Sequence, residues 1–129
     1  MKTETDVQNL SILAIEAAGG WAGRNNSGVA REIDERTGEL RMVRYGLANT
    51  SAKFNAVFKT GDLVGLYQGI FCMWECKAPG WVYRGTERER AQLNAIQHVR
   101  RFGGRAGFVN HPDQAVAIAR GLSRGAYDG

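Results

Sequence analysis

The side chains best suited to chemistry are Asp62, Glu75 and Lys77. The chain between the two acids consists of two runs typical of strands, DLVGLY and IFCMWECK, joined by a Gln-Gly pair that can form a two-residue turn. With the turn at that pair, the two acids lie opposite each other on one face of a hairpin. Lys77, two residues beyond Glu75, shares that face. The spacing therefore predicts a cluster of two carboxylates and one amine.

Facing carboxylates repel each other across a ladder and destabilise it, so we expect a divalent cation between them. Their hard oxygen atoms suit Mg²⁺ or Mn²⁺. A neighbouring lysine can help to deprotonate a water molecule or neutralise charge that develops on a phosphate. An aspartate at the start of a strand is common without any function. A glutamate between Trp74 and Cys76 in an apolar strand, however, is costly unless it is paired.

Further motifs accompany this hairpin in a fixed order. They are Glu4 and Gln8 in ETDVQ, Arg24 in RNNSG, Gly61 before Asp62, the WECKAPG segment around Glu75, Gln92, and two glycines at 103 and 104 followed by AGFV. Together they resemble the PD-(D/E)xK nuclease superfamily, and within it a stand-alone VRR-NUC domain of the phage and bacterial type. The resemblance covers roughly residues 3–120. It departs at Gly61, where the superfamily has proline, and at Cys76, where an aliphatic residue is more usual.

The resemblance implies an α/β fold with a restriction-endonuclease-like core, in the order α-β-β-β-α-β, whose mixed central sheet is flanked by helices. It also implies an endodeoxyribonuclease that depends on one or two Mg²⁺ or Mn²⁺ ions. The residues implied to be catalytic are Glu4, Asp62, Glu75, Lys77 and Gln92. The metal ligands would be Asp62, Glu75 and the backbone carbonyl of Cys76, with Glu4 as an outer or second-metal ligand.

Two of these roles have simpler explanations. Gln92 shares one helix face with Ile96 and Val99, which aims its amide inward, although a half-exposed boundary glutamine has the same pattern. Glu4 lies at the start of a helix, where the helix dipole alone favours an acid. Residues expected to contact DNA are Arg24, Asn25, Lys53, Lys59 and Arg84. Arg88, Arg100 and Arg101 are further candidates for contacts with the DNA backbone, which the sequence cannot rank. Trp81 and Tyr83 could stack on a base or pack the link against the core.

Size and charge agree with one nucleic-acid-binding domain. The chain has 129 residues and a net charge of +4, and its pI is about 9.4, which favours polyanionic partners. We expect a single nuclease domain over residues 1–121 and a flexible tail over 122–129. No stretch approaches the length of a membrane span, and no apolar signal region is present, which predicts a cytoplasmic protein, in the host if a phage encodes it.

The remaining segments are predicted from caps and periodicity. Helices are expected over 5–18, over 86–102 and from Pro112 to Gly121. The first has a capping box at Thr5 and Gln8 or a competing cap at Thr3, and the second has a capping box at Thr86 and Glu89. Strands are expected over 21–25 and 105–109, and a hairpin over 29–45. Residues 46–60 are expected to form a loop.

The expected substrate is DNA, with recognition through phosphates and shape because no base-reading motif is present. A structure-selective enzyme that acts on branched DNA as a homodimer, like a Holliday-junction resolvase, is the favoured interpretation, since a junction needs two coordinated cuts. The alternatives are a non-catalytic DNA-binding module on a nuclease fold and a flap or restriction-type nuclease.

Overall fold

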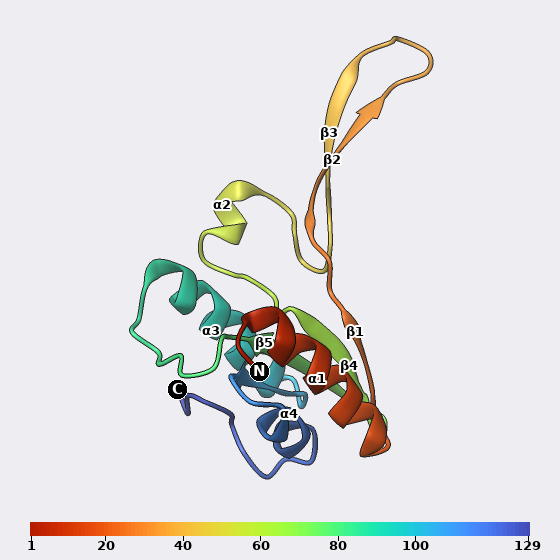
Figure 1. The fold of residues 1–129 in the computed structure, drawn as a ribbon. Helices are drawn as coiled ribbons and strands as arrows, with labels where there is room; N and C mark the ends of the chain where they lie inside the picture. Colours follow the sequence, from red (N-terminus) through yellow and green to blue (C-terminus); the bar gives the residue numbers. More distant parts are fainter.

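In the computed structural model, which describes residues 1–129, helices cover both faces of a four-stranded sheet, and a long two-stranded arm projects from it (Figure 1). The elements in chain order are α1 (Glu4–Ala17), β1 (Trp21–Arg24), β2 (Gly28–Ile33), β3 (Leu40–Tyr45), α2 (Ala52–Asn55), β4 (Leu63–Tyr67), β5 (Ile70–Cys76), α3 (Glu87–Arg101), β6 (Arg105–Val109) and α4 (Pro112–Ala119). None of the helices is long and apolar enough to cross a membrane.

The central sheet has the strand order β1-β4-β5-β6. The first three strands are antiparallel neighbours, whereas β6 runs parallel to β5. A parallel neighbour needs a crossover connection, and α3 supplies it between β5 and β6. The fold is therefore α/β with a mixed sheet flanked by helices, as predicted.

The β4–β5 hairpin has the predicted register. Leu63 pairs with Trp74 and Tyr67 with Ile70. The turn between the strands has positive φ at both central residues, 52° at Gln68 and 80° at the glycine that follows, which is the conformation of a type I′ hairpin turn. The same register, continued by one residue, places Asp62 opposite Glu75.

Two core clusters lie on the two faces of the sheet. Cys72, Trp74 and Cys76 belong to the cluster under α1 and α4. Met73 and Phe108 belong to the cluster under α3. Because side chains alternate along a strand, the residues of β5 that do not face α1 and α4 face α3. Both cysteines are buried free thiols.

Capping residues decide where two of the helices begin. The capping box of α3 at Thr86 and Glu89 is as predicted. In α1, however, Thr3 is the cap and Asp6 completes the box, so the capping box predicted at Thr5 and Gln8 is wrong and the competing cap is correct. Asp6 also accepts a hydrogen bond from the Lys2 N–H, an additional bond that favours the earlier start.

Two other segments have structure that the sequence did not predict. The predicted loop 46–60 contains a short helix, α2, whose cap is Ser51. The tail 122–129 lies along β6: the Ala126 N–H donates to the Phe108 carbonyl, and Tyr127 stacks on Tyr83 with ring centroids 3.9 Å apart. Such contacts are not typical of a frayed end, and the flexibility of the tail stays a prediction.

Candidate metal and active site

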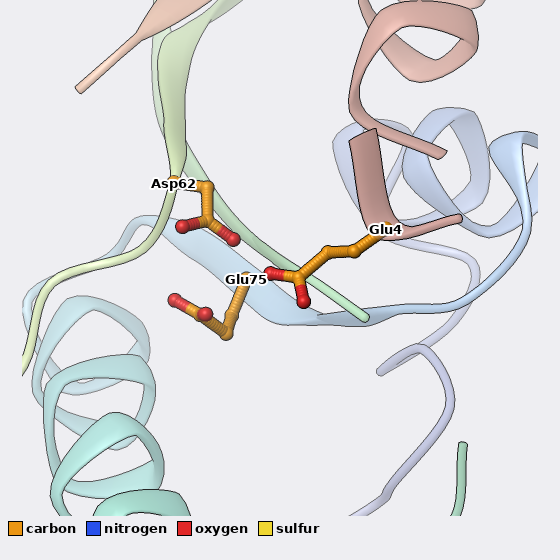
Figure 2. Close-up of side chains that lie close together, drawn as sticks. All are labelled: Glu4, Asp62 and Glu75. Atoms are coloured by element: carbon orange, nitrogen blue, oxygen red, sulfur yellow. The ribbon is translucent and has the colours of Figure 1, made fainter. Parts of the chain in front are cut away.

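Three carboxylates from separate parts of the chain point toward one another (Figure 2). Glu4 begins α1, Asp62 directly precedes β4, and Glu75 lies in β5. One oxygen atom from each group lies within 4.8 Å of one from each of the others. Two oxygen ligands of a single Mg²⁺ are at most about 4.2 Å apart, since each lies about 2.1 Å from the ion. Small side-chain rotations would therefore suffice to close a ligand shell.

Close backbone approach explains the glycine before Asp62. A Cβ atom at Gly61 would lie 2.6 Å from the Trp74 carbonyl oxygen, which is closer than real Cβ atoms come, so the segment can pass over β5 only with glycine here. The Asp62 carboxylate then accepts a hydrogen bond of 2.9 Å from the Cys76 N–H. The departure from the proline of the superfamily thus has a packing reason and brings the aspartate onto β5.

Gln92 connects the lysine to the buried glutamate. Its Nε2 donates to Glu75 Oε1 at 3.0 Å, and its Oε1 accepts from Lys77 Nζ at 2.8 Å. The residue is only 2% exposed, so the inward orientation predicted for this helix face is confirmed. These bonds fix the direction of both Glu75 and Lys77, because each polar atom of the amide is used.

Aromatic rings also support the lysine. Lys77 Nζ lies 5.4 Å from the centroid of the Trp81 ring and 5.9 Å from that of Phe108, within the range of cation–π attraction. Trp81 in turn packs on Phe108 with centroids 4.9 Å apart, and Tyr83 joins the same cluster. Of the two roles left open for Trp81 and Tyr83, the structure therefore favours packing against the core.

The direction of the Cys76 carbonyl follows from the geometry of its peptide unit. The Lys77 N–H donates to Val109 of β6 at 2.7 Å. The carbonyl of Cys76 belongs to the same peptide unit, whose C=O and N–H point in opposite directions. It is therefore directed away from β6, toward the edge of β5 where Asp62 lies, which is the direction that its predicted role as a metal ligand requires.

The cluster is electrostatically unfavourable without a cation. Burial raises the pKa of the Glu75 carboxyl well above its ordinary value, and the neighbouring Asp62 charge raises it further, while Lys77 opposes the shift. Burial and Asp62 also raise the pKa of Glu4. Carboxylates whose charged forms are disfavoured in this way gain the most from a divalent cation.

The raised pKa of Glu75 predicts how stability depends on pH when no metal is present. Between the ordinary pKa of 4.5 and the raised one, the folded protein binds more protons than the unfolded chain. The stability that Glu75 contributes is therefore complete below pH 4.5 and is lost as pH rises through the folded-state pKa. Unfolding in denaturant with EDTA, compared between wild type and Glu75→Gln, should show that the variant becomes the more stable protein toward neutral pH. Parallel pH profiles for the two proteins would contradict the assignment.

Two basic residues share a pocket with the acids. The pocket, about 120 Å³ in volume, is lined by Asp62, Glu75 and Gln92 together with Lys59 and Arg88. Neither basic side chain forms an ion pair with a carboxylate, so both have donors free for a ligand. Lys59 was predicted to contact DNA, and Arg88 was a candidate for such a contact that the sequence could not rank. Arg88 precedes Gln92 by one helical turn and lies on the same helix face, and this spacing could have indicated that it is near the site.

The other residues predicted to contact DNA lie outside the pocket or hold the chain beside it. Arg24 is exposed and donates to the Asn9 side chain. Asn25 holds the chain before Asp62: its Nδ2 donates to the Thr60 hydroxyl and the Gly61 carbonyl, which gives it a structural role at the edge of the pocket. Lys53 in α2 and Arg84 before α3 are exposed and lie outside the pocket. Their contacts with DNA stay predictions.

No model of a known protein family matches the chain, and a search of curated proteins finds no significant match. The resemblance to VRR-NUC nucleases therefore stays an expectation that rests on the sequence motifs.

Proposed function

We propose that the protein is a Mg²⁺- or Mn²⁺-dependent endonuclease that hydrolyses phosphodiester bonds of DNA. The observation that carries the proposal is the convergence of Glu4, Asp62 and Glu75 beside a lysine whose amine is held by Gln92. The donor set consists of carboxylate oxygens and a backbone carbonyl, which suits hard cations of this kind. It contains no histidine, and the nearby cysteine thiols face the opposite side of the sheet, so it does not suit zinc.

The residues present fit such an ion and divide the chemistry between them. Asp62, Glu75 and the Cys76 carbonyl would hold it, with Glu4 at the outer side. A bound ion of this type supplies a Lewis acid and lowers the pKa of a coordinated water. Lys77 donates hydrogen bonds to the attacking water or to a phosphate oxygen on which negative charge develops. Gln92 keeps that amine in place, because it contacts the lysine and the metal-binding glutamate at once.

A DNA-binding module that has lost catalysis is the competing class. Such a module would have no use for Lys77 held by an amide that also contacts Glu75. The test is incubation of plasmid, duplex, flap and four-way-junction DNA with the protein in Mg²⁺ or Mn²⁺, against EDTA. Metal-dependent cutting with a preference for branched DNA is the expected result. Tight binding without cutting of any DNA would favour the module, and a defined recognition sequence would favour a restriction-type enzyme.

Two arginines in the first turn of α3 give a matched test of substrate binding. Arg88 lines the carboxylate pocket, whereas Arg90, two residues further on, lines a separate groove. Arg88→Ala should lower the slope of log affinity against log salt concentration by about 0.9, the value for one lost phosphate contact, when DNA binding is measured in EDTA. Arg90→Ala should leave the slope unchanged. Equal slopes for wild type and both variants would show that Arg88 does not contact a phosphate of the bound DNA.

A further inference from the structure

Glu89 is a buried acid that lies outside the carboxylate cluster. It belongs to the first turn of α3 and is only 7% exposed. A carboxylate in such a position is costly unless hydrogen bonds satisfy both of its oxygen atoms. Its Oε1 accepts hydrogen bonds from the backbone N–H groups of Arg84 and Thr86, at 3.0 and 3.1 Å. One oxygen atom is therefore used to cap the helix.

The second oxygen atom of Glu89 has a different partner. Glu89 Oε2 accepts a hydrogen bond of 2.9 Å from Nε1 of Trp81, and the ring of Trp81 lies beside the Lys77 amine. A capping box needs only one oxygen atom of the acid, so the helix does not require this second bond. The bond instead connects the start of α3 to the ring that contacts the lysine.

Trp81 belongs to no helix or strand, so its ring depends on side-chain contacts for its orientation. It lies in the connection between β5 and α3. Its carbonyl accepts a hydrogen bond of 3.0 Å from Asn110, which fixes the backbone, and its ring packs on Phe108. Packing alone would also permit a flip of the indole about χ2, because that torsion has two broad minima. The N–H bond to Glu89 selects one of the two orientations.

The charge of Glu89 also favours the contact between Trp81 and Lys77. Burial would raise the pKa of the Glu89 carboxyl, but the hydrogen bonds that it accepts lower this pKa below its ordinary value. The group is therefore ionised at neutral pH. An ionised acceptor on the indole N–H polarises the ring and makes its face more negative, which strengthens the attraction for a cation near that face.

Lys77 needs a second restraint besides Gln92. A lysine ammonium is a compact charge on a flexible four-carbon stem, and Gln92 accepts only one of its three donors. A single hydrogen bond leaves the amine free to rotate about that bond. The Trp81 ring, with its centroid 5.4 Å from Nζ, supplies another contact from a different segment of the chain. The two contacts together direct the remaining donors.

We propose that Glu89 is a positioning residue: it holds the indole of Trp81 against Lys77 and so keeps the lysine amine in place beside the carboxylate cluster. The effect on cleavage rests on the proposed function, whereas the effect on the lysine itself does not. The chain offers matched controls. Thr86 caps the same helix with its hydroxyl, and Glu87 is an exposed acid in the same turn.

Kinetics of DNA cleavage should separate positioning from helix capping. Glu89→Gln keeps the size of the side chain, and its amide oxygen can still accept the capping bonds, but its NH₂ group then faces the Trp81 N–H. We expect kcat to fall about 10-fold with KM unchanged, as for groups that orient a catalytic residue through a hydrogen bond. Trp81→Phe, which keeps a ring without the N–H, should give a similar loss, and the double variant should lose no more.

The two controls should behave differently. Thr86→Ala should lower the melting temperature by about 4 °C, because it removes a helix cap, and leave kcat unchanged. Glu87→Gln removes the same charge as Glu89→Gln and should alter neither quantity. A loss of kcat that follows the melting temperature across these variants would overturn the proposal. So would a rise in KM with normal kcat in Trp81→Phe, which would show that Trp81 contacts DNA.

Nuclear magnetic resonance provides a readout that does not require cleavage. The chain has four lysines, so the ε-methylene signals of lysine-labelled protein are few, and Lys77→Met identifies the one of interest. The ring current of Trp81 should shift this signal upfield in wild type. Glu89→Gln should move it toward the position of an exposed lysine, whereas Thr86→Ala and Glu87→Gln should leave it unchanged.

The spectrum and the kinetics can fail separately. An unchanged Lys77 signal in Glu89→Gln would overturn the proposal, whether or not wild type cuts DNA. A signal that moves as expected in a protein that cuts no DNA would support the positioning role of Glu89 and refute the nuclease function instead.

Discussion

Asp62→Asn and Glu75→Gln should each reduce DNA cleavage by at least about a thousandfold, because losing the contribution of a catalytic ion removes several kcal/mol of transition-state stabilisation. Both replacements keep the shape of the side chain. In particular, the amide oxygen introduced at either position can still accept the hydrogen bond that the carboxylate accepts, from the Cys76 N–H in one case and from Gln92 in the other. The loss would therefore report on charge and metal binding, and not on folding.

The affinity for DNA should not fall with the cleavage rate in these two variants. Each replacement removes a negative charge that repels phosphates, so binding measured in EDTA should be unchanged or tighter. Calorimetric titration with Mn²⁺ provides the second readout, in which both variants should bind the ion much more weakly than wild type. Unchanged metal affinity in the two variants would refute the ligand assignment, whatever the cleavage rates.

Lys77→Met should lower kcat by about 10²- to 10³-fold, the range for one positioned donor, while metal binding is retained. The methionine keeps an apolar stem beside Trp81 and Phe108, so the packing of the site is preserved. The variant would separate the role of the lysine from that of the carboxylates. Loss of Mn²⁺ binding in Lys77→Met would instead assign the lysine a structural role in forming the metal site.

Gln92→Leu serves as the companion variant. It removes both hydrogen bonds that connect Glu75 with Lys77 and keeps a side chain of similar volume. We expect a smaller loss of activity, about 10- to 100-fold, as is typical of groups that hydrogen-bond to a metal ligand and orient it. An effect as large as that of Lys77→Met would indicate that the glutamine contacts the substrate directly.

Local geometry explains which parts of the site could be predicted. Opposition of Asp62 and Glu75 follows from the two-residue turn between their strands, since a hairpin register is fixed once the turn is known. The inward direction of Gln92 follows from helical periodicity. The position of Glu4 does not follow from either rule, because it depends on how α1 packs across the sheet. Only the resemblance to nucleases suggested it.

Tertiary packing set the features that the sequence could not reveal. The hairpin over 29–45 was predicted, but alternation along its strands does not tell whether it joins the main sheet, and in the structure it forms a separate arm. Arg88 was one of several arginines without any means of ranking, until the pocket around Gln92 distinguished it. Likewise, the close approach of Gly61 to the Trp74 carbonyl, which explains the missing proline, joins residues on different segments of the chain.

The most direct test of the central claim is metal add-back with a matched pair of proteins. Wild type and Asp62→Asn are purified in parallel, stripped with EDTA and incubated with supercoiled plasmid while Mn²⁺ is restored in steps. The account predicts that wild type is inactive without metal and regains cleavage as Mn²⁺ is added, whereas Asp62→Asn stays inactive at every concentration. Equal cleavage by the two proteins, or none by wild type at any Mn²⁺ concentration, would contradict a metal-dependent nuclease at this site.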